Sequence, residues 1–75
     1  MDLESVRLIS VALAAGIGIL GPAIAIGIIG SHAMDATGRN PDAAGKITTN
    51  MILAIVFAEA LGILAIVVSF IIKFV

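Results

Sequence analysis

Two long apolar runs, separated by a polar stretch, limit what this chain can fold into. Leu8–Gly30 is 23 residues without a charge, and Met51–Ile72 is 22 more, interrupted only by Glu59 and Ser69. As a helix, the first run reaches roughly 33 Å at about 1.5 Å per residue, enough to cross a hydrocarbon core of about 30 Å. A soluble chain this short could not cover so much apolar surface with its own core. We therefore predict two transmembrane helices.

The predicted architecture is an all-α membrane protein, a two-helix transmembrane hairpin in one unit over residues 1–75. The first helix is expected at about 5–38, a polar loop at about 39–43 and the second helix at about 44–74. Ser5 is a candidate cap for the first helix. Asn40-Pro41 predicts the turn, because the residue before proline is kept out of the helical region.

The composition excludes several other classes of protein. The chain has no cysteine, so disulfides and thiolate metal sites are absent, and with a net charge of -1 and no basic cluster it has no nucleic-acid footprint. It shows no nucleophile–base pattern, and its glycines lie inside an apolar helix rather than in a phosphate-binding loop, so we predict no enzyme activity. A signal peptide is disfavoured for the first run, because Asp2 and Glu4 precede it and it is too long. His32 alone predicts no metal site and is interpreted as an interfacial residue.

Small residues of the first helix gather in two opposite arcs at 100° per residue. Such residues let membrane helices approach closely, and two opposite small faces suit a helix with a neighbour on either side, as in a homo-oligomeric ring. The alternative is that glycine is simply more frequent in transmembrane helices. Pro22 also lies in this helix, where it removes one backbone donor. The two arcs are Ala14, Gly18, Gly21 and Ala25, and Gly16, Ala23, Gly27 and Gly30.

Glu59 is the one charge inside either run. An ionised carboxylate at that depth costs several kcal/mol, so an acid there is a functional hypothesis by default. Large apolar residues share its side of the helix, while Ala54, Ala58 and Ala65 lie on another side, expected to face the first helix. No Lys or Arg lies within either run. Glu59 is therefore predicted to be protonated at rest and to ionise when another chain brings a cation. The alternative is an acid that only hydrogen-bonds a neighbouring helix.

Loop charge gives the orientation in the membrane. The connection carries Arg39, Lys46 and the titratable His32, whereas Arg7 and Lys73 lie one at each terminus. By the positive-inside rule we predict a cytoplasmic loop and both termini outside.

These features together resemble the proteolipid, or c-subunit, of the F-type ATP synthase rotor ring. The resemblance runs from about Ala14 to Phe74. The loop stretch Asp35-Ala36-Thr37-Gly38-Arg39-Asn40-Pro41-Asp42 is similar to the family's acidic residue followed by Arg-Gln/Asn-Pro. Phe57-Ala58-Glu59-Ala60-Leu61 is similar to its carboxylate segment.

The resemblance implies a rotor ring of identical subunits in membrane lipid. Each Glu59 would take up an ion from one half-channel of the stationary a-subunit and release it to the other, opposite an arginine of that a-subunit. The loop residues Arg39, Asn40 and Pro41 would face the central stalk. Catalysis would belong to other subunits of the complex.

The resemblance also implies which ion is carried. Sodium-type members add oxygen ligands at positions that correspond here to Ile26, Ala60 and Leu64, none of which has an oxygen side chain. A hard cation needs several oxygen ligands, so H+ is predicted and Na+ is disfavoured. Together with Pro22, these residues form the predicted surroundings of Glu59. No cofactor is expected.

Two alternatives stay open on the sequence. One is the proteolipid of a V-type or archaeal-type rotary ATPase, and the other is a non-rotary two-helix protein in which Glu59 joins helices by hydrogen bonding. Met1 and the lack of a transit peptide favour a bacterial plasma membrane.

Overall fold

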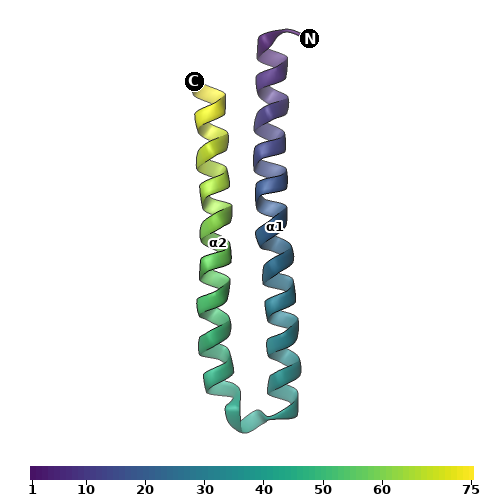
Figure 1. Ribbon diagram of the computed structural model, residues 1–75, viewed down its shortest axis with the longest axis vertical. Coiled ribbons are helices and arrows are strands. Elements are labelled where there is room, and N and C mark those ends of the chain that lie inside the picture. Colours follow the sequence, from purple (N-terminus) through teal and green to yellow (C-terminus); the bar gives the residue numbers. More distant parts are fainter.

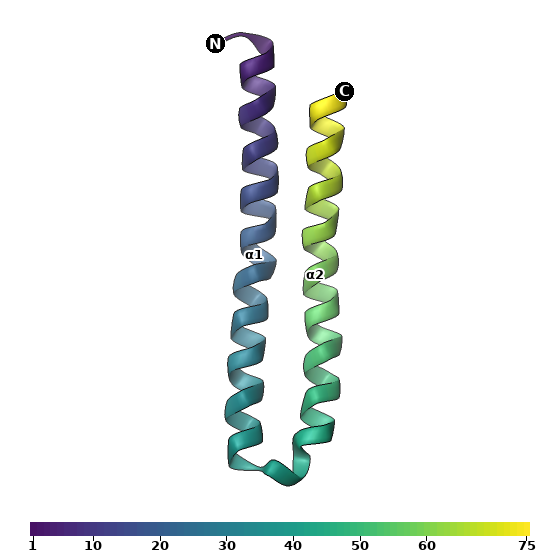
Figure 2. The same cartoon turned by 180° about the vertical axis from the view of Figure 1, so that it is seen from behind.

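The computed structural model describes all residues from 1 to 75 and shows an antiparallel helical hairpin. Helix α1 spans Leu3–Arg39, a short 3-10 turn η1 spans Pro41–Ala43, and α2 spans Ala44–Phe74. Both termini lie at one end and the connection lies at the other (Figures 1 and 2). The Cα trace measures 59 × 17 × 7 Å, so the hairpin is longer than the roughly 30 Å hydrocarbon core and its ends reach the polar headgroups. The predicted two-helix architecture is confirmed.

Helix α1 begins at Leu3 because Asp2 caps it. Asp2 has extended backbone angles, and its Oδ1 accepts a hydrogen bond of 2.8 Å from the backbone amide of Ser5. That bond satisfies one of the amides that have no partner in the first turn of a helix. The prediction that Ser5 is the cap was wrong, since Ser5 is the residue whose amide is capped. The negative charge of this carboxylate also interacts favourably with the dipole at the N-terminal end of the helix.

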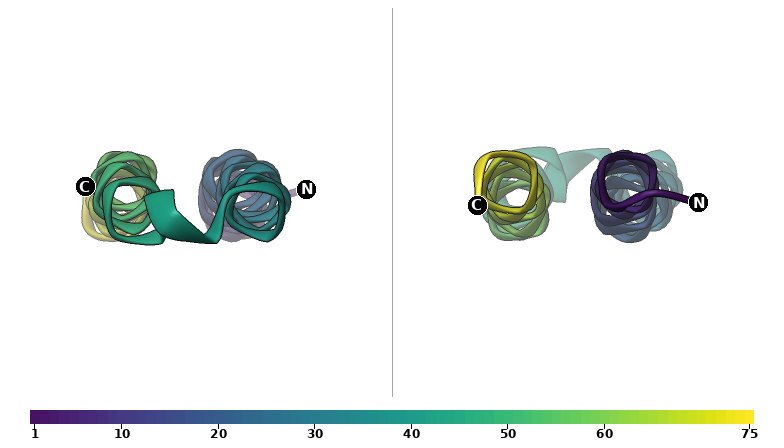
Figure 3. Two further views of the ribbon diagram at one scale, coloured as in Figure 1. Left: turned by 90° about the horizontal axis from the view of Figure 1, so that it is seen from below. Right: turned by 90° about the horizontal axis from the view of Figure 1, so that it is seen from above.

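The chain turns at Asn40. Its φ of -141° and ψ of 78° lie outside the helical region, as expected for a residue before proline, while its amide still donates to the carbonyl of Ala36 at 2.9 Å. Pro41 then opens η1, where its missing donor costs nothing. The reversal is therefore short and places the two helices side by side along their length (Figure 3).

Small residues set how closely the helices pack. A Cβ on Gly18 would overlap the Cβ of Ala65, so the backbone of α1 lies directly against α2 at this level. About one helical turn further along α1, Pro22 lies opposite Gly62 of α2, and a Cβ on Gly62 would be 3.8 Å from that of Pro22. Helix α1 continues unbroken through Pro22. Close backbone approach is the usual basis of helix association in lipid.

The hairpin has almost no core of its own. Only Ala33 and Ser69 are buried. The hydroxyl of Ser69 donates a hydrogen bond of 2.8 Å to the carbonyl of Ala65 in the same helix. Both helices are long and apolar enough to cross a membrane, and almost none of the residues in their apolar stretches is buried in the single chain. The core helix of a soluble protein would be covered by other elements. The structure therefore requires lipid or further copies of the chain around it.

We expect Gly18→Ala to destabilise the hairpin by about 1–3 kcal/mol, the usual cost of overpacking. The double variant Gly18→Ala with Ala65→Gly should recover most of the loss, because it moves the same methyl from α2 to α1. Thermal unfolding in detergent followed by circular dichroism measures both. Gly45→Ala is the matched control, since nothing lies within 4 Å of its added methyl. Equal losses at positions 18 and 45 would contradict the close contact.

The cap predicts a pH effect on the first turn. The Ser5 amide lowers the pKa of Asp2 below its ordinary 3.8. The cap is therefore fully formed above that ordinary value and is lost as pH falls through the lowered pKa. The amide chemical shift of Ser5, measured by NMR in micelles, should follow this transition. Asp2→Asn should keep the cap and abolish its pH dependence, whereas Asp2→Ala should lose the cap at every pH. A Ser5 amide chemical shift whose pH dependence is the same in both variants as in the unaltered protein would contradict the assignment.

Candidate ion-binding site

Glu59 lies on a stripe of α2 that nothing in the chain covers. It is exposed, and so are its neighbours one turn before and after, Val56 at 56% and Ile63 at 61%. The same stripe continues through other exposed apolar residues at helical spacing, namely Ile52, Ile66 and Phe70. Ala54, Ala58 and Ala65 are instead half-buried, on the side of α2 that meets α1. The carboxyl group of Glu59 therefore lies on the outside of the hairpin, among large apolar side chains.

No group within the chain pairs with Glu59. The side-chain hydrogen bonds of the structure involve Asp2, Ser10, Thr49 and Ser69, and none involves Glu59. All four Lys and Arg residues lie outside the two apolar runs, near the ends of the hairpin. A carboxylate in lipid without a cation or donor is costly. Any partner for its charged form has to come from another chain.

The register of the hairpin determines which part of α1 is level with Glu59. Gly18 opposes Ala65 and Pro22 opposes Gly62, so Ile24 and Ala25 lie at the level of Glu59. Folding the chain back at Asn40-Pro41 predicts from the sequence alone that Pro22 lies at this level, give or take one helical turn. The shift is within that turn. Ala25 is half-buried against α2 and Ile24 is exposed, so the side of α1 nearest this level is wholly apolar.

The predicted surroundings of Glu59 divide between two sides of the hairpin. Pro22 and Ile26 are half-buried at the contact between the helices, whereas Ala60 and Leu64 are exposed. A single hairpin therefore does not gather the four residues around the carboxyl group. Their role as the surroundings of the ion stays a prediction that depends on a neighbouring chain.

The two arcs of small residues in α1 have different environments. In the first arc, Ala14, Gly18 and Ala25 are half-buried against α2, while Gly21 is exposed with nothing within 4 Å of an added Cβ. In the second arc, three of the four residues are exposed: Gly16, Ala23 and Gly27, with Gly30 half-buried. The first arc thus has a partner within the chain. The second arc remains open, and its packing in a ring stays a prediction.

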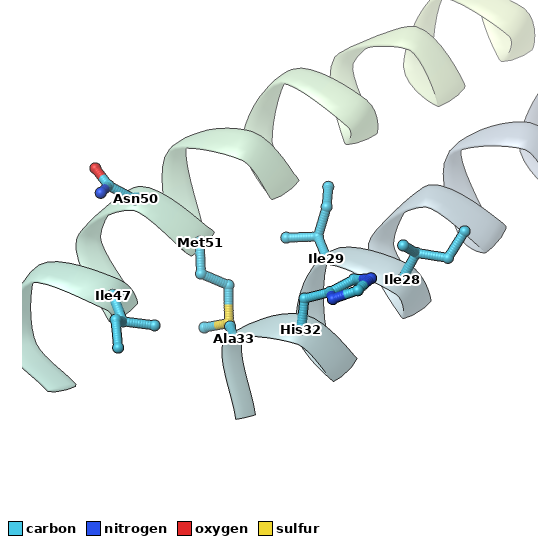
Figure 4. Close-up of a pocket in the computed structure, with 7 residues that line it drawn as sticks. All are labelled: Ile28, Ile29, His32, Ala33, Ile47, Asn50 and Met51. Carbon is cyan, nitrogen blue, oxygen red and sulfur yellow. The ribbon is translucent and has the colours of Figure 1, made fainter. Parts of the chain in front are cut away.

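The polar turn lies at the far end of the hairpin from the termini. Arg39, Asn40 and Pro41 are all exposed there. Between this turn and the apolar part of the hairpin, a shallow hollow of about 420 Å³ is lined by both helices, with His32 and Asn50 as its polar side chains (Figure 4). The hollow is separate from Glu59, which does not line it.

The sequence profile of the ATP synthase c-subunit family matches residues 9–72. The chain belongs to this family. The match includes the first apolar run from Ile9 onward, the whole second run, the Arg39-Asn40-Pro41 turn and Glu59. Membership of the ATP synthase c-subunit family and the exposed apolar surface agree that the hairpin is a membrane protein.

Relatives of this family cover nearly the whole chain. A protein of Dehalococcoides mccartyi, named as an ATP synthase c-subunit, is 47% identical over 75 residues, which is all of this chain and 99% of the relative. A protein of Chloroflexus aurantiacus with the same name is 44% identical over 72 residues, 96% of this chain and 95% of the relative. A protein of Thermotoga petrophila, which also carries this name, is 50% identical over 60 residues, 80% of this chain and 71% of the relative.

The open, apolar setting of Glu59 predicts its chemical reactivity. We expect a hydrophobic carbodiimide, which reacts with protonated carboxyl groups, to modify Glu59 at neutral pH and to leave Glu4 unmodified. The reaction should slow as pH rises, because the carboxylate form is unreactive. Mass spectrometry of the modified peptides measures both glutamates in one sample. Modification of Glu4 alone would mean that the carboxyl group of Glu59 is covered or ionised.

Proposed function

We propose that the chain is a rotor-ring subunit of an F-type ATP synthase and carries protons by reversible protonation of Glu59. The observation that supports this most directly is the position of Glu59: a lone carboxyl group on the outward face of a membrane hairpin, without a partner in its own chain. The family of the chain supports the same conclusion.

The mechanism follows from the cost of charge in lipid. While Glu59 faces lipid, the neutral carboxylic acid is strongly favoured over the carboxylate. A cation carried by a neighbouring protein would reverse this preference at one place, where the proton would leave. The proposed partner is an arginine of the a-subunit of the complex. Since the hairpin supplies no cation of its own, protonation and release are tied to the position of the hairpin around the ring.

The exposed second arc of α1 supports assembly with further copies. Gly16, Ala23 and Gly27 are exposed in the single chain, and small residues allow another helix to approach closely. The first arc packs on α2. In each hairpin, the second arc would therefore be the face of small residues that is left without a partner. A ring of identical subunits would cover the open face.

The proposed ion is H+ rather than Na+. Around Glu59 neither Ile26, Ala60 nor Leu64 offers an oxygen side chain, whereas a hard cation binds through several oxygen atoms. A proton needs only the carboxyl group itself. The absence of any hydrogen bond from α1 to Glu59 gives no support to the alternative in which this residue only joins two helices.

The proposed location is a bacterial plasma membrane, with the turn in the cytoplasm and both termini outside. Both termini lie at one end of the hairpin (Figure 1), so they share one side of the membrane. The cytoplasmic side would be that of Arg39 and Lys46. There the exposed residues Arg39, Asn40 and Pro41 would contact the central stalk.

Replacing Glu59 tests the proposal. We expect Glu59→Gln to abolish proton-driven ATP synthesis in inverted membrane vesicles while the ring still assembles, because the amide neither binds nor releases a proton. Glu59→Asp should retain a reduced rate. Glu4→Gln, at the only other glutamate, is the matched control and should leave synthesis unchanged.

The choice of ion is tested on the same vesicles. Sodium should neither drive synthesis in the absence of a proton gradient nor slow the carbodiimide reaction of Glu59. Protection by sodium would refute the assignment to H+. Full proton-driven synthesis by Glu59→Gln would refute the role of Glu59 itself.

A further inference from the structure

The hollow near the turn brings together two polar side chains that have no partner in their own chain. Its volume is about 420 Å³, and its lining is apolar except for His32 of α1 and Asn50 of α2 (Figure 4). Both residues are exposed, and neither takes part in a side-chain hydrogen bond of the structure. A neutral imidazole and an amide each donate and accept hydrogen bonds. The hollow is therefore an apolar surface with two unused polar groups at its rim.

Two neighbouring threonines of α2 use their hydroxyl groups differently. Thr49 donates to the carbonyl of Gly45 at 3.0 Å, within its own helix. Thr48 is exposed and makes no such bond. It lies two residues before Asn50, which places it about 160° around α2 and about 3 Å along the helix axis. The uncommitted hydroxyl of Thr48 is thus on the flank of the hairpin opposite the hollow, at nearly the same level.

Helix α1 shows the same relation between its two flanks. His32 comes nine residues after Ala23 and two after Gly30, which is about 180° and about 160° around the helix. Ala23 and Gly30 belong to the second arc of small residues, so this arc points away from the hollow. When identical subunits pack head-to-tail, one face of each meets the opposite face of the next. A ring that covers the second arc therefore also covers the hollow with a further copy of the chain.

We propose that the hollow receives the next copy of the chain, and that Asn50 of one hairpin forms a hydrogen bond with the Thr48 hydroxyl of its neighbour. His32 would lie against the next copy's Gly30, where the absence of a side chain leaves room for the imidazole. The contact lies at the edge of the hydrocarbon core, because the apolar run of α2 begins at Met51. A polar group covered there without a partner is costly. The inference rests on the proposed ring and adds to it a defined polar contact between copies.

Paired cysteines test the contact directly, because the chain has no cysteine of its own. In membranes that contain the full chain, Thr48→Cys with Asn50→Cys should form disulfides between copies on mild oxidation. Non-reducing gel electrophoresis, under conditions that dissociate the uncross-linked oligomer, should then show a ladder of multimers. Each single variant should stay monomeric, because like positions do not meet in a head-to-tail contact. The matched control, Thr49→Cys with Asn50→Cys, moves one cysteine by about 100° and should give no ladder.

Apolar substitutions test the hydrogen bond itself. Thr48→Val and Asn50→Leu should each lower the temperature at which the oligomer dissociates in mild detergent. The double variant should lose clearly less than the sum of the two, because both changes remove the same bond. Thr49→Val is the control and should leave this temperature unchanged, since its hydroxyl bonds within its own helix.

The outcomes separate this contact from the proposed function. Dimers from a single cysteine variant would show a two-fold contact and refute the proposal, as would an equal ladder from the control pair or additive losses in the apolar variants. An oligomer of full size without a ladder would refute the contact alone. A protein that runs as a single hairpin in mild detergent would refute the ring and the contact with it. Proton-driven ATP synthesis by the reduced Thr48→Cys with Asn50→Cys variant measures the function of Glu59 independently.

Discussion

The cost of exposing polar groups to lipid is the constraint on which the rest of this structure depends. Two helices satisfy most backbone amides and carbonyls internally, and 60 of the 64 backbone hydrogen bonds lie inside the regular elements. Because no soluble core has to be built, most of the large apolar side chains are exposed on the outside of the hairpin. The few polar side chains within the apolar runs bond to their own helix, as Ser10 and Ser69 do. Glu59 is the exception, and the proposed function rests on its neutral form and on a partner from another chain.

The two helices contribute differently to that function. Helix α1 is rich in small residues and provides surfaces of close approach, one of which is occupied by α2 through the contact of Gly18 with Ala65. Helix α2 carries bulky apolar residues outward and holds Glu59 among them. A carboxyl group on the outward stripe of α2 is accessible to another chain, whereas a carboxyl group on the face towards α1 would be enclosed by the hairpin. The contact between the helices therefore orients the carboxyl group that we propose to carry the ion.

The ends of the hairpin are specialised by the same physical rules. At the turn, Pro41 and the non-helical Asn40 end one helix and start the next within a few residues, so the exposed polar groups gather at one headgroup region. At the termini, the Asp2 cap and Lys73 place opposite charges near the ends of the helix dipoles that favour them.

The sequence alone determined the two spans, the depth of Glu59, the turn at Asn40-Pro41 and the family motifs, because hydrophobicity, helical periodicity and proline act through neighbours in the chain. It also separated the side of Ala54, Ala58 and Ala65 from the side of Glu59. The structure showed that Asp2 rather than Ser5 caps α1, through a local hydrogen bond. Only the tertiary structure decided that, within the turn that the sequence allowed around Pro22, Ile24 and Ala25 are the residues level with Glu59, and that the first arc of small residues packs on α2. The register and the choice of face depend on the shape of the turn and on how closely Gly18 lets the backbones approach, and both arise from contacts between residues far apart in the sequence.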